Sequence, residues 1–450
     1  MRILRKKSIL NSRTFNWGLL ISGMLLFGCG PQSESGSSEI PEEGSLASDE
    51  KDSLPPGLWQ KGRKSAPNTN REEQDFSALD AIGYSDGFNP ATEQANVTVH
   101  IANQAQAGYN FYTSGHGPEV ILMDMQGQVL HRWEKPIAEL WPGREIDPTH
   151  IFGQYFRRAL LQPNGDIFAV VAGYGLVKLD KDSNLIWSYD SRVHHDLELL
   201  EDGSILTLTR ETTTRPDVNA DEPVVEDFVV ILNSRGEEQL KVSTLNALQN
   251  AAEQYPKLVE EMPRDGDLLH VNSVEMLDGR LAEIDPAFKK GNVLISLHRN
   301  SVVAVMDLDA ERIVWAKTGR WTNQHHPRVL DKNRLLIYNN VAGNSKAGGK
   351  VSSILEYDLE QDGVAWSFRG NRKIPFRSDA LGSVHRLANG NTLIIESQYG
   401  RALEVTRDKQ LVWEFYSPHR AGTEDELVAV LLDVIRVPMN FPLDWLASER

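Results

Sequence analysis

The stretch N-Q-H-H-P-R-V-L-D-K-N-R-L-L-I-Y-N-N, residues 323–340, repeats a pattern found at residues 194–208, H-H-D-L-E-L-L-E-D-G-S-I-L-T-L. A shift of 130 positions places His325 on His195 and aligns the apolar pairs of both stretches. A shift of 75 aligns residues 270–276, H-V-N-S-V-E-M, so that His270 also falls on His195. Packing alone gives a histidine no reason to recur in register. We therefore expect His195, His270 and His325 to converge on one site.

Around these stretches the chain carries a longer repeat of strand, polar turn and strand. Five of its six copies end in tryptophan, and the copies span residues 120–133, 176–187, 228–240, 302–315, 353–366 and 402–413. Most are preceded by a second hairpin whose polar turn contains Gly or Asn, as in P-N-G-D at 163–166 and D-K-N-R at 331–334. The Asn-Gly and Asp-Gly pairs among these turns supply the positive φ of tight turns. Two hairpins per unit, six times over, predict an all-β fold: a six-bladed β-propeller with four-stranded blades. Two packed β-sandwiches are the alternative, but they require no sixfold unit.

The remaining segments complete the predicted organisation. We expect the propeller to extend over residues 108–450, with an inserted helix at about 244–266 and a C-terminal helix at about 424–435. Residues 75–107 hold one alternating run and predict a small N-terminal β element, as a cap or an edge strand. Residues 30–74 are rich in Ser, Glu, Gly and Pro and predict a disordered tether, since such a segment buries too little apolar surface to offset its ordering entropy.

The first 29 residues have the parts of a lipoprotein signal peptide: a basic start, a short apolar run and small residues around Cys29. Cys29 is the only cysteine, which excludes an intramolecular disulfide and a cysteine metal cluster. The step L-F-G-C resembles the bacterial lipobox, so we expect Cys29 to carry a lipid. It would anchor the protein on the periplasmic side of the cell envelope, at the outer membrane because no acidic residue follows the cysteine. An ordinary secretory signal with an incidental cysteine is the alternative.

The formal net charge of −16 becomes more negative once the basic signal is removed. A surface this acidic argues against nucleic acid or an anionic membrane surface as the main partner.

Extending the register of the three histidines brings further positions to the same place. Arg157 falls at the equivalent of His195 in one direction, and Gly382 in the other. Equivalent positions on successive inner strands face one end of a propeller's channel, so imidazoles and an arginine would form a cationic pocket suited to an oxyanion. Arg299 ends a predicted strand and would add a second guanidinium. His116, His131 and His150 fall outside the pattern and are predicted to be turn or surface residues.

Two other interpretations of the three histidines remain open. They could bind zinc, because a site built only of histidines is physically reasonable, although no carboxylate shares their register. They could also be structural and bond the carbonyls of neighbouring blades. We expect no metal and no cofactor.

Several motifs together resemble the bacterial arylsulfotransferase family over roughly residues 97–446. They are H-H-D at 194–196, L-L-H-V-N-S at 268–273, Q-H at 324–325, N-G-N-T-L-I at 389–394, G-R-A-L-E-V at 400–405 and V-W-E-F at 412–415. The resemblance implies a six-bladed periplasmic propeller that moves a sulfuryl group from an aryl sulfate to a phenol through a sulfohistidine. A propeller lipoprotein that binds a ligand or serves as a scaffold, without catalysis, is the alternative.

The resemblance also implies roles for site residues. His325 is expected to be the nucleophile, with His195, His270 and Arg299 around the sulfate. The substrate-binding set is expected to comprise His194, His326, His298, Arg157 and Asn272. The chain departs from the family pattern where His298 precedes Arg299, and where His326 replaces an acidic residue after the nucleophile. Alternation along a strand lets one of two adjacent histidines face the channel, and the register selects His325 over His326.

Overall fold

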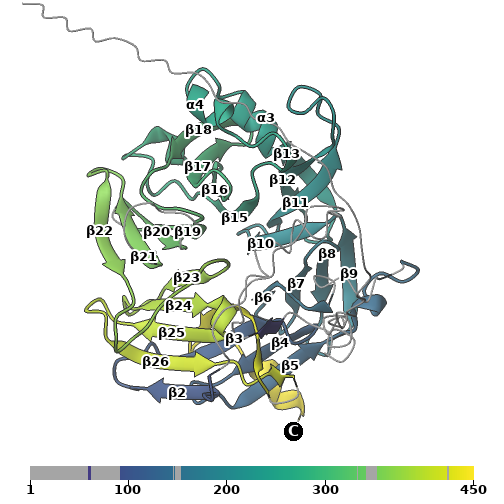
Figure 1. The fold of residues 1–450 in the computed structure, drawn as a ribbon. Coiled ribbons are helices and arrows are strands. Elements are labelled where there is room, and N and C mark those ends of the chain that lie inside the picture. Colours follow the sequence, from purple (N-terminus) through teal and green to yellow (C-terminus); the bar gives the residue numbers. More distant parts are fainter. Residues whose placement is uncertain are drawn as a thin grey trace, which may run out of the picture. The chain divides into compact units, whose positions relative to one another are not determined.

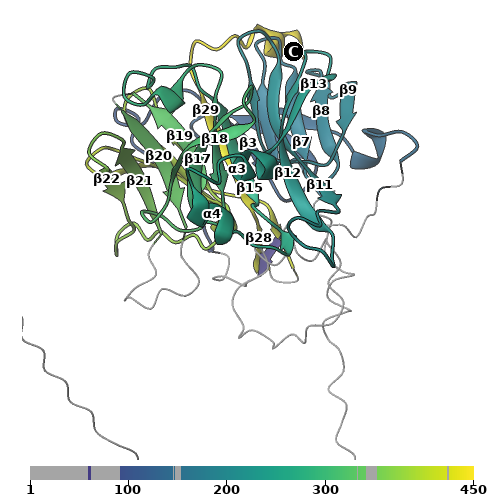
Figure 2. The same cartoon turned by 90° about the horizontal axis from the view of Figure 1, so that it is seen from above.

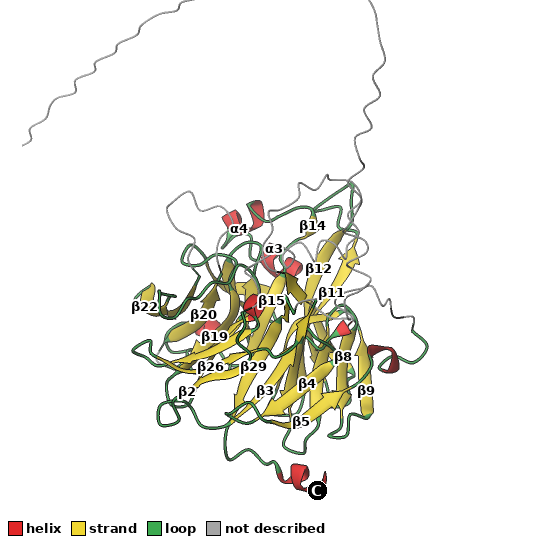
Figure 3. Ribbon diagram, turned by 60° about the horizontal axis from the view of Figure 1, so that its bottom comes forward, coloured by secondary structure: helices red, strands yellow, loops and turns green. Residues whose placement is uncertain are grey.

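Short runs of apolar residues separated by tight turns fold this chain into consecutive antiparallel hairpins. The computed structural model describes residues 59–61, 92–144, 146, 154–331, 333–340, 352–422 and 425–449. Six sheets of four or five strands stand in a ring, which confirms the predicted six-bladed propeller (Figure 1). Strands dominate the described chain and its helices are few and short (Figure 3).

Each blade runs from an inner strand at the channel to an outer strand. In that order, blade 1 consists of β29 (Leu431–Val437), β3 (Tyr109–Ser114), β4 (Glu119–Met123) and β5 (Val129–Glu134), and blade 2 consists of β6 (Arg158–Leu161), β7 (Ile167–Val171), β8 (Gly175–Leu179) and β9 (Leu185–Asp190). Blade 3 consists of β10 (Val193–Leu199), β11 (Ile205–Thr213), β12 (Val224–Leu232) and β13 (Glu238–Ser243), with β14 (Gly266–Asp267) beside β12, and blade 4 consists of β15 (Val271–Met276), β16 (Val293–Leu297), β17 (Val302–Asp307) and β18 (Arg312–Lys317). Blade 5 consists of β19 (His325–Leu330), β20 (Arg334–Asn339), β21 (Ser353–Asp358) and β22 (Gly363–Phe368), and blade 6 consists of β23 (Ser383–Arg386), β24 (Thr392–Glu396), β25 (Arg401–Val405), β26 (Leu411–Tyr416) and β2 (Asn96–His100).

The repeated tryptophans tie neighbouring blades together. The indole N–H of Trp133 donates to the carbonyl of Gly165 in the next blade at 3.0 Å, and that of Trp413 donates to Met125 at 3.0 Å. Trp187 and Trp366 make the same kind of bond, to Ser234 and Arg407. A buried indole needs a partner for its single donor, so a turn carbonyl one blade along fixes both the packing and the spacing of the blades.

The C-terminal segment closes the ring, and here the predicted helix at 424–435 is wrong. Residues 427–429 form β28 (Leu427–Ala429), and β29 pairs antiparallel with β3 as the inner strand of blade 1. Figure 2 shows β28 and the C-terminus at opposite ends of the strands. A short buried apolar run has no periodicity that separates helix from strand, and the partner of β29 lies more than 300 positions away in the sequence.

The predicted helical insertion consists of two short helices, α3 (Thr244–Gln249) and α4 (Pro256–Glu260). The hydroxyl of Ser243 caps α3 by accepting from the backbone N–H of Asn246 at 3.0 Å. The remaining short elements are the 3₁₀ turns η1 (Ile137–Glu139), η3 (Pro286–Phe288), η4 (Ser397–Tyr399) and η5 (Asp444–Glu449) and the strand β27 (Arg420–Ala421).

The N-terminal predictions are met in part. Strand β2 lies at the outer edge of blade 6, so the described part of the predicted N-terminal β element is an edge strand. Within the predicted tether, β1 (Trp59–Lys61) pairs with β28, so these three residues are not disordered. The rest of residues 30–74, and the signal with Cys29, lie outside the described residues. No helix among the described residues is long and apolar enough to span a membrane.

Candidate active site

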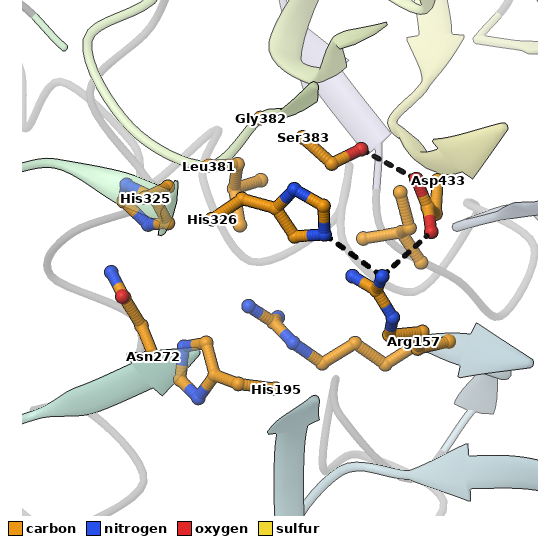
Figure 4. A pocket seen from close by; sticks show the side chains of 11 residues that line it. Arg157, His195, Asn272, His325, His326, Leu381, Gly382, Ser383 and Asp433 are labelled. Atoms are coloured by element: carbon orange, nitrogen blue, oxygen red, sulfur yellow. Dashed lines mark hydrogen bonds and ion pairs between the residues drawn. The ribbon is translucent and has the colours of Figure 1, made fainter. Parts of the chain in front are cut away.

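Four of the positions that the repeat register selects meet in one small cavity at the end of the channel. Its volume is about 30 Å³, room for about two water molecules. Its lining comprises Arg157, Arg158, His195, Asn272, His325, His326, Leu381, Gly382, Ser383, Leu432 and Asp433 (Figure 4). The register therefore placed Arg157, His195, His325 and Gly382 correctly. Gly382 has φ +102°, and a Cβ there would meet the Tyr338 ring at 2.3 Å, so this position holds no side chain.

Both His325 and His326 line the cavity, so the prediction that only one of them faces the channel is wrong. The pairing of β19 with β20 shifts register between His325 and Arg328, and His326 has φ +50°. In blade 3 the register shifts after His194 and His195 has φ +58°. In backbone conformation His195 therefore corresponds to His326, one position beyond the His325 that the sequence alignment selects. A bulge breaks the alternation of side chains and redirects them, which strand periodicity alone does not reveal.

The tautomer of His325 is fixed by its neighbours. The amide nitrogen of Asn340 donates to the carbonyl of Leu381 at 2.8 Å and to the hydroxyl of Ser378 at 3.0 Å. The amide oxygen of Asn340 therefore faces Nδ1 of His325, 2.8 Å away, and the Asn323 carbonyl lies 3.2 Å from the same nitrogen. Both are acceptors, so Nδ1 carries the proton and Nε2 keeps its lone pair. No described residue hydrogen-bonds that Nε2 atom.

The charge state of His325 follows from its burial. Burial lowers its pKa to about 3, and the hydrogen bond from Nδ1 to Asn340 offsets only part of that effect. The charges of His270 and Arg157 lower the pKa further. His325 is thus neutral at any physiological pH.

The two nitrogens of His326 are both engaged. Nδ1 donates to the carbonyl of Val384 at 3.0 Å, and Nε2 accepts from the guanidinium of Arg158 at 2.9 Å (Figure 4). The lone pair that a nucleophile would need is bound to a cation. The hydrogen bonds therefore show that only His325 keeps a free ring lone pair, a difference that the alternation of side chains along a strand does not predict.

A row of imidazole rings lies against the cavity. Ring centroids are 5.0 Å apart for His194 and His195, 4.9 Å for His195 and His270, 5.1 Å for His270 and His298, and 5.0 Å for His298 and His325. Burial holds the pKa of His195 and His298 well below 6.5, with Arg157 and His325 as the respective next causes. His194, His270 and His298 are not in the cavity lining, so the register prediction for His270 is wrong on this point, although its ring contacts that of His195.

Carboxylates hold two members of this row, His270 at its centre and His194 at one end. Nδ1 of His270 lies 2.5 Å from the carboxylate of Asp267, and Nε2 of His194 lies 3.2 Å from that of Asp227. Burial alone would raise the pKa of Asp267, but the charge of His270 lowers it, so Asp267 is ionised. The pair can share a proton close to the cavity.

Arginines supply the positive charge, though not the pair that the sequence suggested. The Arg157 side chain extends between His195 and His326 (Figure 4). Arg299 is absent from the cavity lining, and its guanidinium donates to the Asp267 carbonyl at 2.9 Å. The second arginine in the lining is Arg158, which forms ion pairs with Asp196 at 3.0 Å and with Asp433 at 3.4 Å.

Asn272 lies as predicted in the lining and offers an acceptor. Its amide nitrogen donates to the carbonyl of Gln324 at 3.0 Å, and its Oδ1 is buried without a hydrogen-bond partner among the described residues. Such an atom is satisfied when a ligand donates to it.

Sequence reasoning missed Asn340, Arg158, Asp196 and Asp433 as site residues. The N-N pair at 339–340 and the third letter of H-H-D were visible signals, whereas Asp433 was hidden by the incorrect helix. Within the described residues, the donor atoms of His195, His270 and His325 do not converge on a shared metal position.

The fold and the site define a six-bladed propeller with a pocket lined by histidine and arginine at one end of its channel. Residues 160–418 match the family described as arylsulfotransferase (ASST). The match covers more than half of the chain, which therefore belongs to the arylsulfotransferase family. No curated protein is significantly similar to it in sequence.

Among solved structures, the chain is similar to a protein of unknown function from Bacteroides caccae, at 12% identity and TM-score 0.45, over 72% of this chain and 99% of that one. The Dos1 propeller is 9% identical with TM-score 0.38, over 73% of this chain and 74% of that one. A streptogramin B lyase is 11% identical with TM-score 0.40, over 76% and 92%. Similarity at this level says nothing about activity.

Proposed function

We propose that the protein transfers a sulfuryl group from an aryl sulfate to a phenolic acceptor, with His325 as the covalent carrier. One observation carries this proposal: Asn340 fixes the proton of His325 on Nδ1, so the lone pair of Nε2 is free in an arginine-lined cavity. A neutral imidazole nitrogen with a free lone pair is the form that attacks an electrophile.

In the first step, Nε2 of His325 attacks the sulfur of the donor. The N–S bond forms as the bond from sulfur to the aryl oxygen breaks, and the phenolate leaves. Positive charge then develops on the imidazole ring, where the oxygens of Asn340 and Asn323 accept from Nδ1–H. Arg157 and Arg158 lie where they stabilise the sulfonate oxygens as charge accumulates.

In the second step, an acceptor phenol attacks the same sulfur and the N–S bond breaks, which restores neutral His325. The phenol proton must leave, and His195 is the imidazole of the cavity that contacts the His270–Asp267 pair. We assign that pair the task of holding the proton and returning it to the departing phenolate of the next donor. The unpaired Oδ1 of Asn272 would accept the hydroxyl of the bound phenol.

A chromogenic aryl sulfate tests the function directly. Mixing it with the enzyme should give a burst of phenol equal to the enzyme present, followed by turnover when a phenolic acceptor is added. His325→Ala should abolish both, whereas His326→Ala, checked for folding by thermal unfolding, should keep a measurable part of each. Mass spectrometry of enzyme quenched at alkaline pH, which preserves the N–S bond, should place the sulfuryl group on His325.

Three results would overturn the assignment: sulfation on His326, wild-type activity in His325→Ala, or no phenol release from any of several donors. The last result would favour a scaffold or ligand-binding propeller.

We also propose that Cys29 is lipidated and holds the enzyme at the periplasmic face of the outer membrane. The lipobox-like step and the polar segment that follows it support this placement. Cys29→Ser should release the protein into the soluble fraction or leave its signal uncleaved. Unchanged size and unchanged distribution would refute the anchor.

A further inference from the structure

A second cluster of imidazole and carboxylate groups lies at the seam where the ring of blades closes. His116 occupies the turn between β3 and β4, Glu119 begins β4, and His419 lies between β26 and β27. One donor atom from each residue lies within 4.8 Å of the others, and no other group of three such residues in the described chain converges in this way. His419 is 300 positions from Glu119, so the cluster is a product of the fold rather than of local sequence.

The cluster contains nitrogen atoms that need a partner. Nδ1 of His116 and Nε2 of His419 are both buried, and neither has a hydrogen-bond partner among the described residues. Nε2 of His116 lies 2.6 Å from one carboxylate oxygen of Glu119, and Arg132 donates to the other oxygen. Each buried polar atom without a partner needs an explanation, and a ligand that is bound in solution is one.

The two histidines also meet in an unusual way. Their rings are stacked at a centroid distance of 3.4 Å with 3° between the planes. Two imidazolium rings would repel each other at this distance, so at least one ring is neutral. Neutral imidazole is the form that ligates metal ions.

We propose that His116, Glu119 and His419 bind a divalent transition-metal ion, for which Zn²⁺ is the best match. Two imidazoles and one carboxylate form a known zinc donor set, with the fourth position left to water. An imidazole lone pair lies in the plane of its ring, and these two planes are parallel and stacked. One ion cannot lie in both planes, so one ring must turn as the ion enters. The ion then replaces the hydrogen bond between His116 and Glu119. Arg132 keeps the carboxylate oriented from the far side, as outer partners of metal ligands do.

The position of the cluster indicates what the ion would do. His116 and Glu119 belong to the hairpin of blade 1 that pairs with β29, and His419 belongs to the segment that leads from blade 6 through β27 and β28 to β29. The backbone N–H of Ala429 in β28 also donates to the carbonyl of His419 at 3.1 Å. An ion at this point would link the segment that leads into β29 with the β3–β4 hairpin of blade 1, which β29 completes. Binding would therefore stabilise the closed ring of blades.

Zinc titration of the purified full-length chain tests the proposal. Chelator-stripped protein, titrated with Zn²⁺ against a chromophoric competitor, should bind about one equivalent, and its thermal unfolding midpoint should rise with Zn²⁺. His419→Ala should lose both effects. Glu119→Gln, nearly isosteric and therefore suited to a buried site, should weaken binding roughly tenfold or more.

Two histidine variants serve as matched controls. His100→Ala removes a partly exposed histidine of β2 and should bind as the wild type does. His325→Ala should also retain the ion, which would show that the metal binds at this cluster and not in the cavity around His325. The proposal fails if the wild type binds no Zn²⁺, if His419→Ala binds it as tightly as the wild type, or if His325→Ala loses it.

Discussion

Replacing Asn340 with alanine removes the group that holds the proton of His325 on Nδ1. The bond between them is 2.8 Å long and both residues are buried, at 2% and 5% exposure. A neutral buried hydrogen bond is worth about 1 kcal/mol, and one to a charged group about 1.5–3 kcal/mol. The ring is neutral before attack and positive during it, so the loss at the transition state exceeds the loss in the ground state by about 0.5–2 kcal/mol. Asn340→Ala should therefore slow enzyme sulfation about 2–30-fold.

Stopped-flow measurement of the phenol burst reports this step, and Ser378→Ala is its matched control. That substitution leaves the bond between Asn340 and His325 in place, and the Leu381 carbonyl still accepts from the amide nitrogen. Its burst rate should stay within about twofold of wild type.

Asn340→Asp tests the same bond through the pH–rate profile, which would not change if Asn340 had only a structural role. A carboxylate beside Nδ1 favours the imidazolium form and raises the pKa of His325 from its value of about 3. The acid limb of the pH–rate profile should move to higher pH. An unmoved limb, or equal burst rates in Asn340→Ala and Ser378→Ala, would refute the tautomer argument.

Three further outcomes follow from the structure. Arg157→Met should lower kcat/KM for the donor roughly 10²–10³-fold, as loss of a preorganised donor does, whereas Arg299→Met should cost far less, which steady-state kinetics would show. Val434→Asp places a carboxylate on a fully buried position of β29 and should destabilise the fold by about 3 kcal/mol or more, measured by urea unfolding. Burial lowers the pKa of His194, His195, His298, His325 and His326, so the unfolded state binds more protons below pH 6.5. Stability should therefore fall as pH drops from 6.5 towards the lowered pKa values, and His298→Phe should reduce that slope by about 1.4 kcal/mol per pH unit.

The repeat in the sequence predicted the blades because each hairpin is a local structure with its own turn residues, such as Asn164-Gly165. It also predicted where Arg157, His195, His325 and Gly382 would meet, because a rotationally repeated unit brings equivalent positions to one end of its channel. The failures share a physical cause. Strand β29 depends on a partner at the other end of the chain, and the orientation of His326 depends on a bulge. Neither property is contained in a local pattern.

Arg158 shows why the polar side of this site could not be predicted from register. Its guanidinium contacts Asp196 of blade 3, His326 of blade 5 and Asp433 of blade 1. Asp196 accepts from the backbone N–H of Val274 in blade 4 at 3.0 Å, and Asp433 accepts from the hydroxyl of Ser383 in blade 6 at 2.5 Å.

All six blades thus meet through one buried network, whose charges are tolerable only when every partner is present. One of these partners, Asp433, belongs to β29, the strand that closes the ring. Arg158 is therefore held in position against His326 only in the closed propeller. Loosening of β29 should accordingly disorder the cavity around His325 and His326 before the other blades separate.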